Sequence, residues 1–303
     1  MKPVRYVIWL LFIVTGLLCA SEKSLVAFAQ DTMANDFRKA QVHEVEETLS
    51  HYPDIMFLSS DAEGRISLMI NQIEHFIAQK VDVLIVGTND ASAIVPVVEK
   101  AYSSGIKVVI LDRGVDTDGY TTFINSDNRK IGTLAAAFIA KELNQEGKVL
   151  LFEGLENIDV TEQRTQGFLE EIRKYEKIQV ITRRGNYLRR DAIIEMEKLI
   201  SEGIRLDAIF SESDSMLSGV RAVLRRHGID PDSLIMVGCD YTSEAKEAIM
   251  QGTQSASVLF PLGGKKAAEV AVTLLKGEGV PKHIQIPVKL VTKENVKEVS
   301  PIF

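Results

Sequence analysis

Beyond residue 20, short runs of β-branched and other apolar residues alternate with longer stretches in which apolar positions recur at helical spacing. Residues 83–86 are continuously apolar, as in a strand buried on both faces, whereas residues 66–79 place their apolar side chains on one face of a helix. The order strand, helix, strand, helix predicts a parallel sheet with helices on both sides. In this first unit, strands are expected at 25–29, 55–58, 83–86 and 107–111, and helices at 35–50, 66–79 and 93–104.

The same alternation restarts in the second half of the chain. No low-complexity linker separates the two units, so we expect short hinge segments rather than a flexible tether. The pattern predicts an α/β protein with two doubly wound parallel-sheet lobes. Strands of the second unit are expected at 148–152, 179–183, 208–210, 234–237, 256–259 and 284–290, and helices at 162–175, 190–201, 215–226, 243–250 and 263–276.

The first 20 residues have the features of an export signal. Lys2 and Arg5 precede an apolar run that ends in small residues, after which the chain turns polar. The run of about 15 residues is shorter than the roughly 20 needed to span a bilayer, which argues against an uncleaved anchor helix. We expect residues 1–20 to be removed by cleavage near Ala20. Attachment of a lipid at Cys19, which would anchor the chain to a membrane, is the alternative.

The net charge argues against one class of ligand, and the cysteine content indicates the role of Cys239. The 303 residues include 35 Lys and Arg against 42 Asp and Glu, a formal net charge of -7. An acidic surface repels phosphate backbones, which argues against nucleic-acid binding. Loss of Cys19 with the signal would leave Cys239 as a single thiol, and Cys239 ends an apolar run, so we expect it to be a packed core residue.

The chain lacks the common signatures of catalysis and metal binding. It contains no G-x-G-x-x-G, P-loop, G-x-S-x-G, H-E-x-x-H or C-x-x-C sequence, and its five histidines are not spaced as metal ligands. We therefore expect no catalytic residue, no metal and no cofactor. No helix-turn-helix precedes the first strand, which argues against a repressor of the same fold.

Polar residues follow the predicted strands, where ligands bind in sheets of this type. If two lobes face each other, these strand ends meet in one cleft. The residues concerned are Gln30-Asp31, residues 87–90, Asp112-Arg113, Ser213-Asp214 and Cys239-Asp240.

These motifs, taken in order, resemble the periplasmic sugar-binding proteins of the ribose/galactose type, the type I periplasmic binding proteins. Each motif is weak alone, but their order and spacing are specific, and the resemblance covers roughly residues 24–290. The motifs are Val108 to Arg113, Asn125-Ser126-Asp127-Asn128 with Gly132, Gln163-Arg164 with Gly167-Phe168, Ser213 to Met216 with Gly219, and Val237-Gly238-Cys239-Asp240.

The resemblance implies a monomeric periplasmic protein that binds a small sugar or sugar derivative and delivers it to an ABC-type permease. It implies three crossovers between lobes, near Ser126, Phe260 and Ile284. The expected N-terminal lobe comprises residues 21–126 and 261–284, and the C-terminal lobe residues 127–260 and 285–303. Residues 261–266 look more like the equivalent segment of sensor-linked relatives, so presentation of the ligand to a membrane sensor histidine kinase is the alternative.

The resemblance also implies a ligand pocket. Carboxylates, guanidinium groups and an amide suit sugar hydroxyls, and two rings would face the apolar side of the sugar. Arg38 is expected to reach the ligand, and Ser213 and Phe260 stand where relatives commonly have Asn and Gln. The other expected contacts are Phe37, Asp112, Arg113, Asn128, Arg164, Tyr187 and Asp240.

Each of these residues also has a purely structural alternative. Asp112 and Arg113 could pair with each other, and Phe37 could be a core residue. Asn128 could start a helix, Asp240 could cap one, Tyr187 could pack in a loop, and Arg164 could be exposed.

A secreted enzyme that acts on a sugar is the rival from another class. It would need a poised acid and base in the cleft, and Asp112 and Asp240 could supply the carboxylates. The arginines near them are expected to keep both ionised, which is unfavourable for a general acid. The three candidate arginines Arg38, Arg113 and Arg164 would also accept a ligand with a carboxylate or phosphate.

Overall fold

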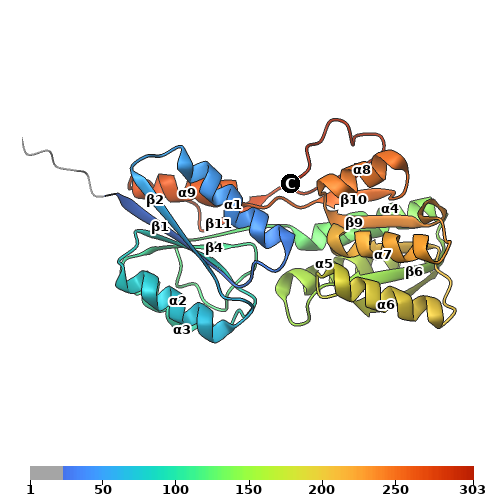
Figure 1. The fold of residues 1–303 in the computed structure, drawn as a ribbon, viewed down its shortest axis with the longest axis horizontal. Helices are drawn as coiled ribbons and strands as arrows, with labels where there is room; N and C mark the ends of the chain where they lie inside the picture. Colours follow the sequence, from blue (N-terminus) through green and yellow to red (C-terminus); the bar gives the residue numbers. More distant parts are fainter. Residues whose placement is uncertain (1–22) are drawn as a thin grey trace, which may run out of the picture.

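The computed structural model describes residues 23–303, which form two lobes side by side (Figure 1). Each lobe is built on one six-stranded sheet with helices on both faces, so the prediction of two parallel-sheet lobes is confirmed. The export signal and its alternatives at Cys19 lie outside the described residues. Within residues 23–303, no helix has the length and apolar character needed to cross a bilayer.

The first lobe has the strand order β11-β5-β4-β3-β1-β2, with every neighbouring pair parallel. Its strands are β1 (Ser24–Gln30), β2 (Ile55–Asp61), β3 (Val83–Gly87), β4 (Lys107–Leu111), β5 (Thr122–Ser126) and β11 (His283–Ile286). Its helices are α1 (Asp36–Ser50), α2 (Ile66–Ala78), α3 (Val95–Ser103) and α9 (Gly264–Leu275).

The second lobe has the order β12-β10-β9-β8-β6-β7, in which only β12 runs antiparallel to its neighbour. Its strands are β6 (Glu146–Glu153), β7 (Lys177–Arg184), β8 (Ala208–Ser211), β9 (Ile235–Asp240), β10 (Ala256–Leu259) and β12 (Lys289–Thr292). Its helices are α4 (Asn128–Glu142), α5 (Asp159–Ile172), α6 (Arg189–Ser201), α7 (Asp214–Arg226) and α8 (Ser243–Gln251), with a 3-10 turn at Pro231–Ser233.

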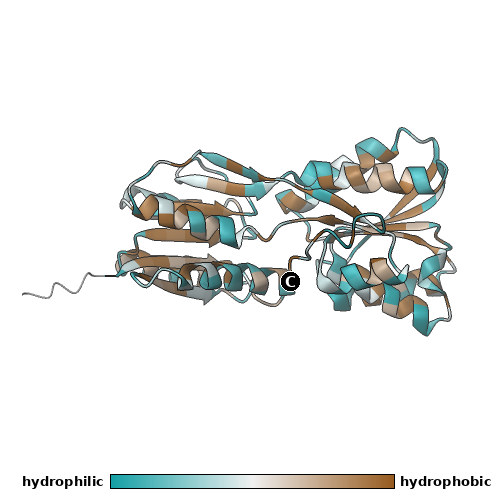
Figure 2. Cartoon of the chain, turned by 90° about the horizontal axis from the view of Figure 1, so that it is seen from above, coloured by the Kyte–Doolittle hydropathy of each residue, from teal (hydrophilic) through white to brown (hydrophobic). Residues whose placement is uncertain are grey.

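Apolar side chains on both faces of each sheet form the cores. Along β1, Val26 and Phe28 pack against α1 and α9, while Ala27 and Ala29 pack against α2 and α3. The second sheet is likewise enclosed by α4 and α5 on one face and by α6 and α7 on the other. Figure 2 shows the result, with hydrophobic strands between helices whose outer faces are hydrophilic. Burial on both faces explains why the strands are continuous apolar runs.

The chain passes between the lobes three times. It crosses after β5, again at Phe260 after β10, and last between β11 and β12. The single strand expected at 284–290 is wrong, because Pro287 and Val288 separate two strands that belong to different sheets. Proline has no N–H to donate to a strand ladder, so pairing stops there. We propose that these crossings form the hinge; the residue boundaries of the lobes stay a prediction.

Two glycines allow the first pair of helices in the second lobe to pack closely. A Cβ atom on Gly132 of α4 would lie 2.0 Å from the carbonyl oxygen of Arg164, and one on Gly167 of α5 would lie 2.0 Å from that of Arg129. The helix backbones therefore approach as only glycine permits. Since α5 also carries Arg164 into the region between the lobes, this contact sets the position of that arginine.

Replacement Gly167→Ala is expected to destabilise the protein, because the added methyl group forces α4 and α5 apart. Overpacking of this kind costs about 1–3 kcal/mol in free energy of unfolding, measurable by urea denaturation. Gly279→Ala is the control, since nothing lies within 4 Å of the added Cβ atom, and it should change stability by less than about 0.5 kcal/mol. Equal unfolding midpoints for the two variants would contradict the close-packing account.

Candidate ligand-binding site

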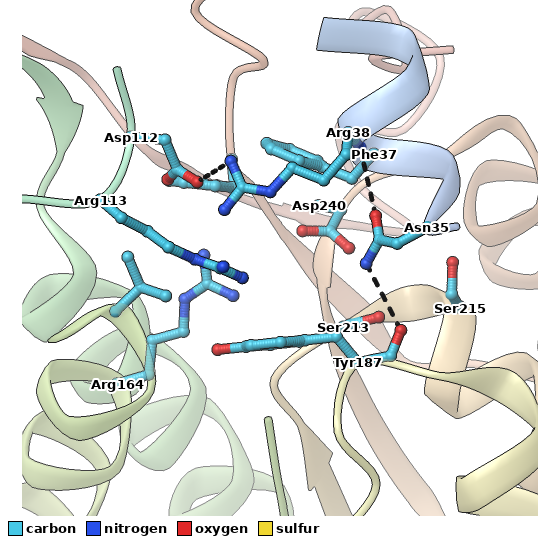
Figure 3. A pocket seen from close by; sticks show the side chains of 12 residues that line it. Asn35, Phe37, Arg38, Asp112, Arg113, Arg164, Tyr187, Ser213, Ser215 and Asp240 are labelled. Carbon is cyan, nitrogen blue, oxygen red and sulfur yellow. Dashed lines mark hydrogen bonds and ion pairs between the residues drawn. The ribbon is translucent and has the colours of Figure 1, made fainter. Parts of the chain in front are cut away.

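A small cavity of about 30 Å³ lies between the two lobes (Figure 3). Its walls come from the start of α1 and the end of β4 in the first lobe, and from α5, the loop before α6, the start of α7 and the end of β9 in the second. The lining residues are Asn35, Phe37, Arg38, Asp112, Arg113, Val160, Arg164, Tyr187, Ser213, Ser215, Asp240 and Phe260.

All of the pocket residues expected from the sequence line this cavity except Asn128. Asn128 lies behind it, where its Oδ1 accepts a hydrogen bond of 2.9 Å from Nε of Arg164. It is also the first residue of α4, whose N-cap is Asp127. Asn128 therefore orients the arginine, whereas Asn35, Val160 and Ser215 line the cavity and were missed.

Several structural alternatives are settled by the geometry. Arg164 is buried rather than exposed, and the N-cap of α8 is Thr242, not Asp240. Ser213 caps α7 by accepting from the Met216 N–H. Position in the cavity does not by itself establish contact with a ligand, so the binding roles of these residues stay predictions.

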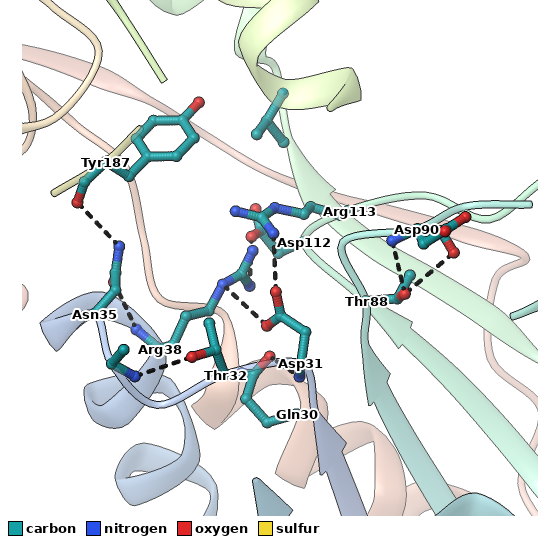
Figure 4. A network of polar contacts seen from close by, with 12 residues as sticks. Gln30, Asp31, Thr32, Asn35, Arg38, Thr88, Asp90, Asp112, Arg113 and Tyr187 are labelled. Carbon is teal, nitrogen blue, oxygen red and sulfur yellow. Dashed lines mark hydrogen bonds and ion pairs between the residues drawn. The ribbon is translucent and has the colours of Figure 1, made fainter. Parts of the chain in front are cut away.

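Three buried arginines dominate the electrostatics of the cavity. Arg38 pairs with Asp112 at 2.7 Å between Nη1 and Oδ2, and Arg113 pairs with Asp31 at 3.1 Å between Nη1 and Oδ2. Figure 4 shows these partners converging from β1, α1 and β4. Asp112 and Arg113 therefore do not pair with each other. The pKa of Arg113 is lowered, mainly by burial and to a smaller extent by repulsion from the Arg38 guanidinium group.

Polar atoms around the cavity remain without protein partners. Oδ1 of Asp112 and Nε of Arg113 are buried and make no hydrogen bond within the described part of the chain. The Asp240 carboxyl group also lines the cavity, and a hydrogen bond from the backbone of Asp214 acts on it. Because buried polar groups are normally paired, the free acceptor on Asp112 and the free donor on Arg113 indicate a polar ligand.

Burial raises the pKa of the Asp240 carboxyl well above its usual range, although Arg164 acts in the opposite direction. Burial therefore acts against the expectation that neighbouring arginines keep Asp240 ionised, and that expectation stays a prediction. Desolvation of a carboxylate inside a closed cavity outweighs the attraction of one guanidinium group that also serves other partners. Arg164 donates to Asn128 and to the carbonyl oxygen of Glu212 as well.

The aromatic residues support one another and the arginines. Phe37 stacks on Phe260 with ring centroids 5.2 Å apart, and the guanidinium of Arg164 lies 4.5 Å from the Phe260 centroid. One face of Phe37 is thus covered by the ring of Phe260, which the family resemblance did not imply. Phe37 also joins the hydrophobic core of the second lobe, so its core alternative holds alongside its place in the cavity wall.

Backbone in the left-handed region places several cavity side chains. The φ angles are 72° at Asp112, 60° at Tyr187 and 106° at Asp240, and such values are strained for residues other than glycine. Asp214 supports the last of these, since its Oδ2 accepts the N–H of Tyr241 at 2.7 Å. Its carboxylate also accepts from Ser257. This second layer holds Asp240 toward the cavity.

A family model described as periplasmic binding protein domain matches residues 26–279 of the chain. The chain belongs to this family. Among curated relatives of this periplasmic binding protein is the ribose import binding protein of Bacillus subtilis, with 34% identity over 237 residues, 77% of this chain and 76% of the relative.

Solved structures resemble this periplasmic binding protein over almost its whole length. An ABC transporter solute-binding protein from Bacillus halodurans with bound myo-inositol has a TM-score of 0.86 and 29% identity, covering 92% of this chain and 97% of its own. The fructose-binding periplasmic domain of a hybrid two-component system has a TM-score of 0.82 and 26% identity, covering 91% and 92%. The similar solved structures thus include both a transport protein and a domain of a two-component system.

Glu212 is fully buried next to the hydroxyl group of Tyr187. The pKa of its carboxyl group predicts how the stability of this periplasmic binding protein changes with pH. Burial raises its pKa to about 8, against the opposing effects of Arg164 and of hydrogen bonds from Gly154 and Thr165. The folded state therefore keeps this proton up to about pH 8, whereas the unfolded chain releases it near pH 4.3. Stability contributed by the protonated form is complete below the lower value and is lost as pH rises through this window.

Replacement Glu212→Gln, which resembles the protonated form, is expected to remove this loss. Relative to the native chain, the variant should gain stability between about pH 5 and 8, by up to about 1 kcal/mol per pH unit. Urea unfolding at several pH values measures the difference, with Glu153→Gln, on the neighbouring strand, as control. A difference between Glu212→Gln and the native chain that does not change with pH would contradict the raised pKa.

Proposed function

We propose that this periplasmic binding protein binds a small sugar or sugar-like polyol in the cavity between its lobes. The unpaired Oδ1 of Asp112 and the unpaired Nε of Arg113 carry this proposal, and the Asp240 carboxyl group lines the same cavity. A hydroxyl group both donates and accepts, so a polyol can supply a donor to the carboxyl oxygens and an acceptor to the guanidinium. Relatives named for ribose and myo-inositol support the same ligand class.

Binding proceeds by hinge closure. Arg38, Arg113 and Arg164 are at most 6% exposed, so a ligand reaches them only when the lobes part. Ligand contacts with both lobes then favour a closed state. Charge-assisted hydrogen bonds of this kind are compatible with a micromolar dissociation constant, about -8 kcal/mol.

The chain works as a carrier rather than an enzyme. Its family relatives are binding proteins, and delivery of the closed, loaded form to an ABC-type permease is the main role that we propose. We further propose that it acts as a monomer in the periplasm, after removal of residues 1–20, without a cofactor or metal. Chemical conversion of a bound sugar by the purified protein would contradict the carrier role.

A sensing role is the second candidate. Similarity to the periplasmic domain of a two-component system supports it, together with the segment from Pro261 to Lys266. In this role the closed form would contact a membrane sensor histidine kinase instead of a permease. Deletion of the gene should abolish uptake of the ligand in the transport role, but abolish only ligand-dependent transcription in the sensing role.

A thermal-shift screen of the purified protein tests the ligand class. Pentoses, hexoses, inositols, sugar acids and sugar phosphates form the panel. A ligand at 100 times its dissociation constant adds about 2.7 kcal/mol and should raise the melting temperature by a few degrees. Asp112→Asn should weaken binding of the best ligand at least about tenfold, because a charge-assisted acceptor is lost.

Asp116→Asn is the matched control for this test, because Asp116 is an exposed carboxylate in the loop after Asp112. It should leave the affinity unchanged in calorimetric titrations. No response to any compound of the panel would sink the sugar proposal, and equal affinity of Asp112→Asn and the native chain would place the ligand elsewhere.

A further inference from the structure

One hydrogen bond joins the two lobes directly, without passing through the cavity. The N–H of Gly114 donates to Oδ2 of Asp159 at 2.9 Å. Gly114 follows Asp112 and Arg113 at the end of β4 in the first lobe, and Asp159 opens α5 in the second lobe, directly before Val160 of the cavity wall. The bond thus ties together two segments that carry cavity residues.

The local geometry is suited to this contact. A Cβ atom on residue 114 would lie 3.3 Å from Oδ2 of Asp159, tighter than most real contacts, so glycine permits the close approach. The other carboxylate oxygen accepts the N–H of Val160 at 2.8 Å, which fixes the orientation of the group. Hydrogen bonds to a carboxylate are stronger than those between neutral groups, and Asp159 is partly shielded from solvent.

A weaker bond crosses the cleft elsewhere. Nδ2 of Asn35, the N-cap of α1, donates to the carbonyl oxygen of Tyr187 at 3.5 Å. Figure 3 shows Asn35 and Arg113 at opposite sides of the cavity, so the lobes are joined at more than one edge. At 3.5 Å this bond contributes less than the Asp159 contact.

We propose that Asp159 is a closure latch, whose carboxylate holds the two lobes together by accepting the Gly114 N–H across the cleft. The proposal rests on the hinge closure proposed above. The latch exists only when the lobes are together, so it shifts the equilibrium between open and closed forms toward the closed form even before a ligand binds. Asp159 is a positioning residue, because it does not line the cavity.

If Asp159 served only to stabilise helix α5, a different experimental result would be expected. Acidic residues in the first turn of a helix stabilise the helix through its dipole, and α5 has two of them, Asp159 and Glu162. Glu162 is exposed and makes no side-chain hydrogen bond within residues 23–303. Glu162→Ala therefore removes a charge from the same helical turn without touching the contact between lobes.

The distance between the lobes, measured without any ligand, tests the latch. Spin labels at Tyr102→Cys and Ile194→Cys in a Cys19→Ser background report it by pulsed electron resonance. These positions are 46% and 48% exposed on α3 and α6, and Cys239 is fully buried and should remain unlabelled. In Figure 1, α3 and α6 lie on the same side of the molecule, opposite α9 and α8, so parting of the lobes on that side lengthens the distance between them.

The native chain should show mainly the short distance. Asp159→Ala should raise the ratio of open to closed forms about tenfold, the effect expected for loss of one partly exposed hydrogen bond to a charged group. Asp159→Asn, which keeps a neutral acceptor, should fall between the two, and Glu162→Ala should match the native chain. Thermal unfolding of each labelled variant checks that it is folded.

Three results would overturn the latch. They are a native chain that is mainly open, equal distance distributions for the native chain and both Asp159 variants, and an equal shift in Glu162→Ala. The measurement uses no sugar, so it fails or succeeds separately from the ligand screen. If the Asp159 variants shift the distance distribution but no compound of the panel binds, the latch is supported and the sugar proposal is refuted. If a sugar binds but the Asp159 variants leave the distribution unchanged, the sugar proposal is supported and the latch is refuted.

Discussion

Burial of three arginine side chains between two lobes is the constraint on which the site depends. A guanidinium group removed from water is tolerated only with acidic or carbonyl partners. Arg38 and Arg113 find Asp112 and Asp31, and Arg164 finds Asn128 and a carbonyl oxygen. Each partner comes from a different element, so the charges can be compensated only when β1, α1, β4, α4 and α5 occupy their observed places. The cavity and the fold are therefore established together.

Strain at the cavity is supported by a second layer of contacts. Asp240 adopts an unfavourable φ angle, and the Asp214 carboxylate accepts a hydrogen bond from the N–H of the next residue, Tyr241. The hydroxyl of Tyr241 extends this support to the C-terminal segment, where it lies 3.0 Å from the carbonyl oxygen of Val296. Strained backbone persists where surrounding structure over-determines it, commonly at ligand sites. Substitutions in this second layer should therefore affect binding without touching the ligand.

In the two-lobed arrangement, the residues that would contact a ligand differ from those that would hold the lobes closed. Recognition rests on side chains that face the cavity, whereas the bond between Gly114 and Asp159 lies outside its lining. Proteins of this architecture with different partners, such as those of a transporter and of a two-component system, can therefore keep similar cavities while differing in the contacts that close the lobes. The equilibrium between open and closed forms then sets the fraction of protein ready to bind, and hence the apparent affinity.

Local pattern alone was enough to predict the alternating elements and the strand ends that carry Asp112, Arg113 and Asp240, because apolar periodicity and strand-end position are properties of adjacent residues. It missed β5 and α4, merged β11 with β12, and started α5 three residues late, where no capping side chain marks the first turn. The pairing of Arg38 with Asp112, the stacking of Phe37 on Phe260 and the contact of Gly114 with Asp159 arose only from the folded arrangement. These partners are 45 or more residues apart in the chain, and contacts at such separation depend on how whole lobes pack, about which local propensity carries no information.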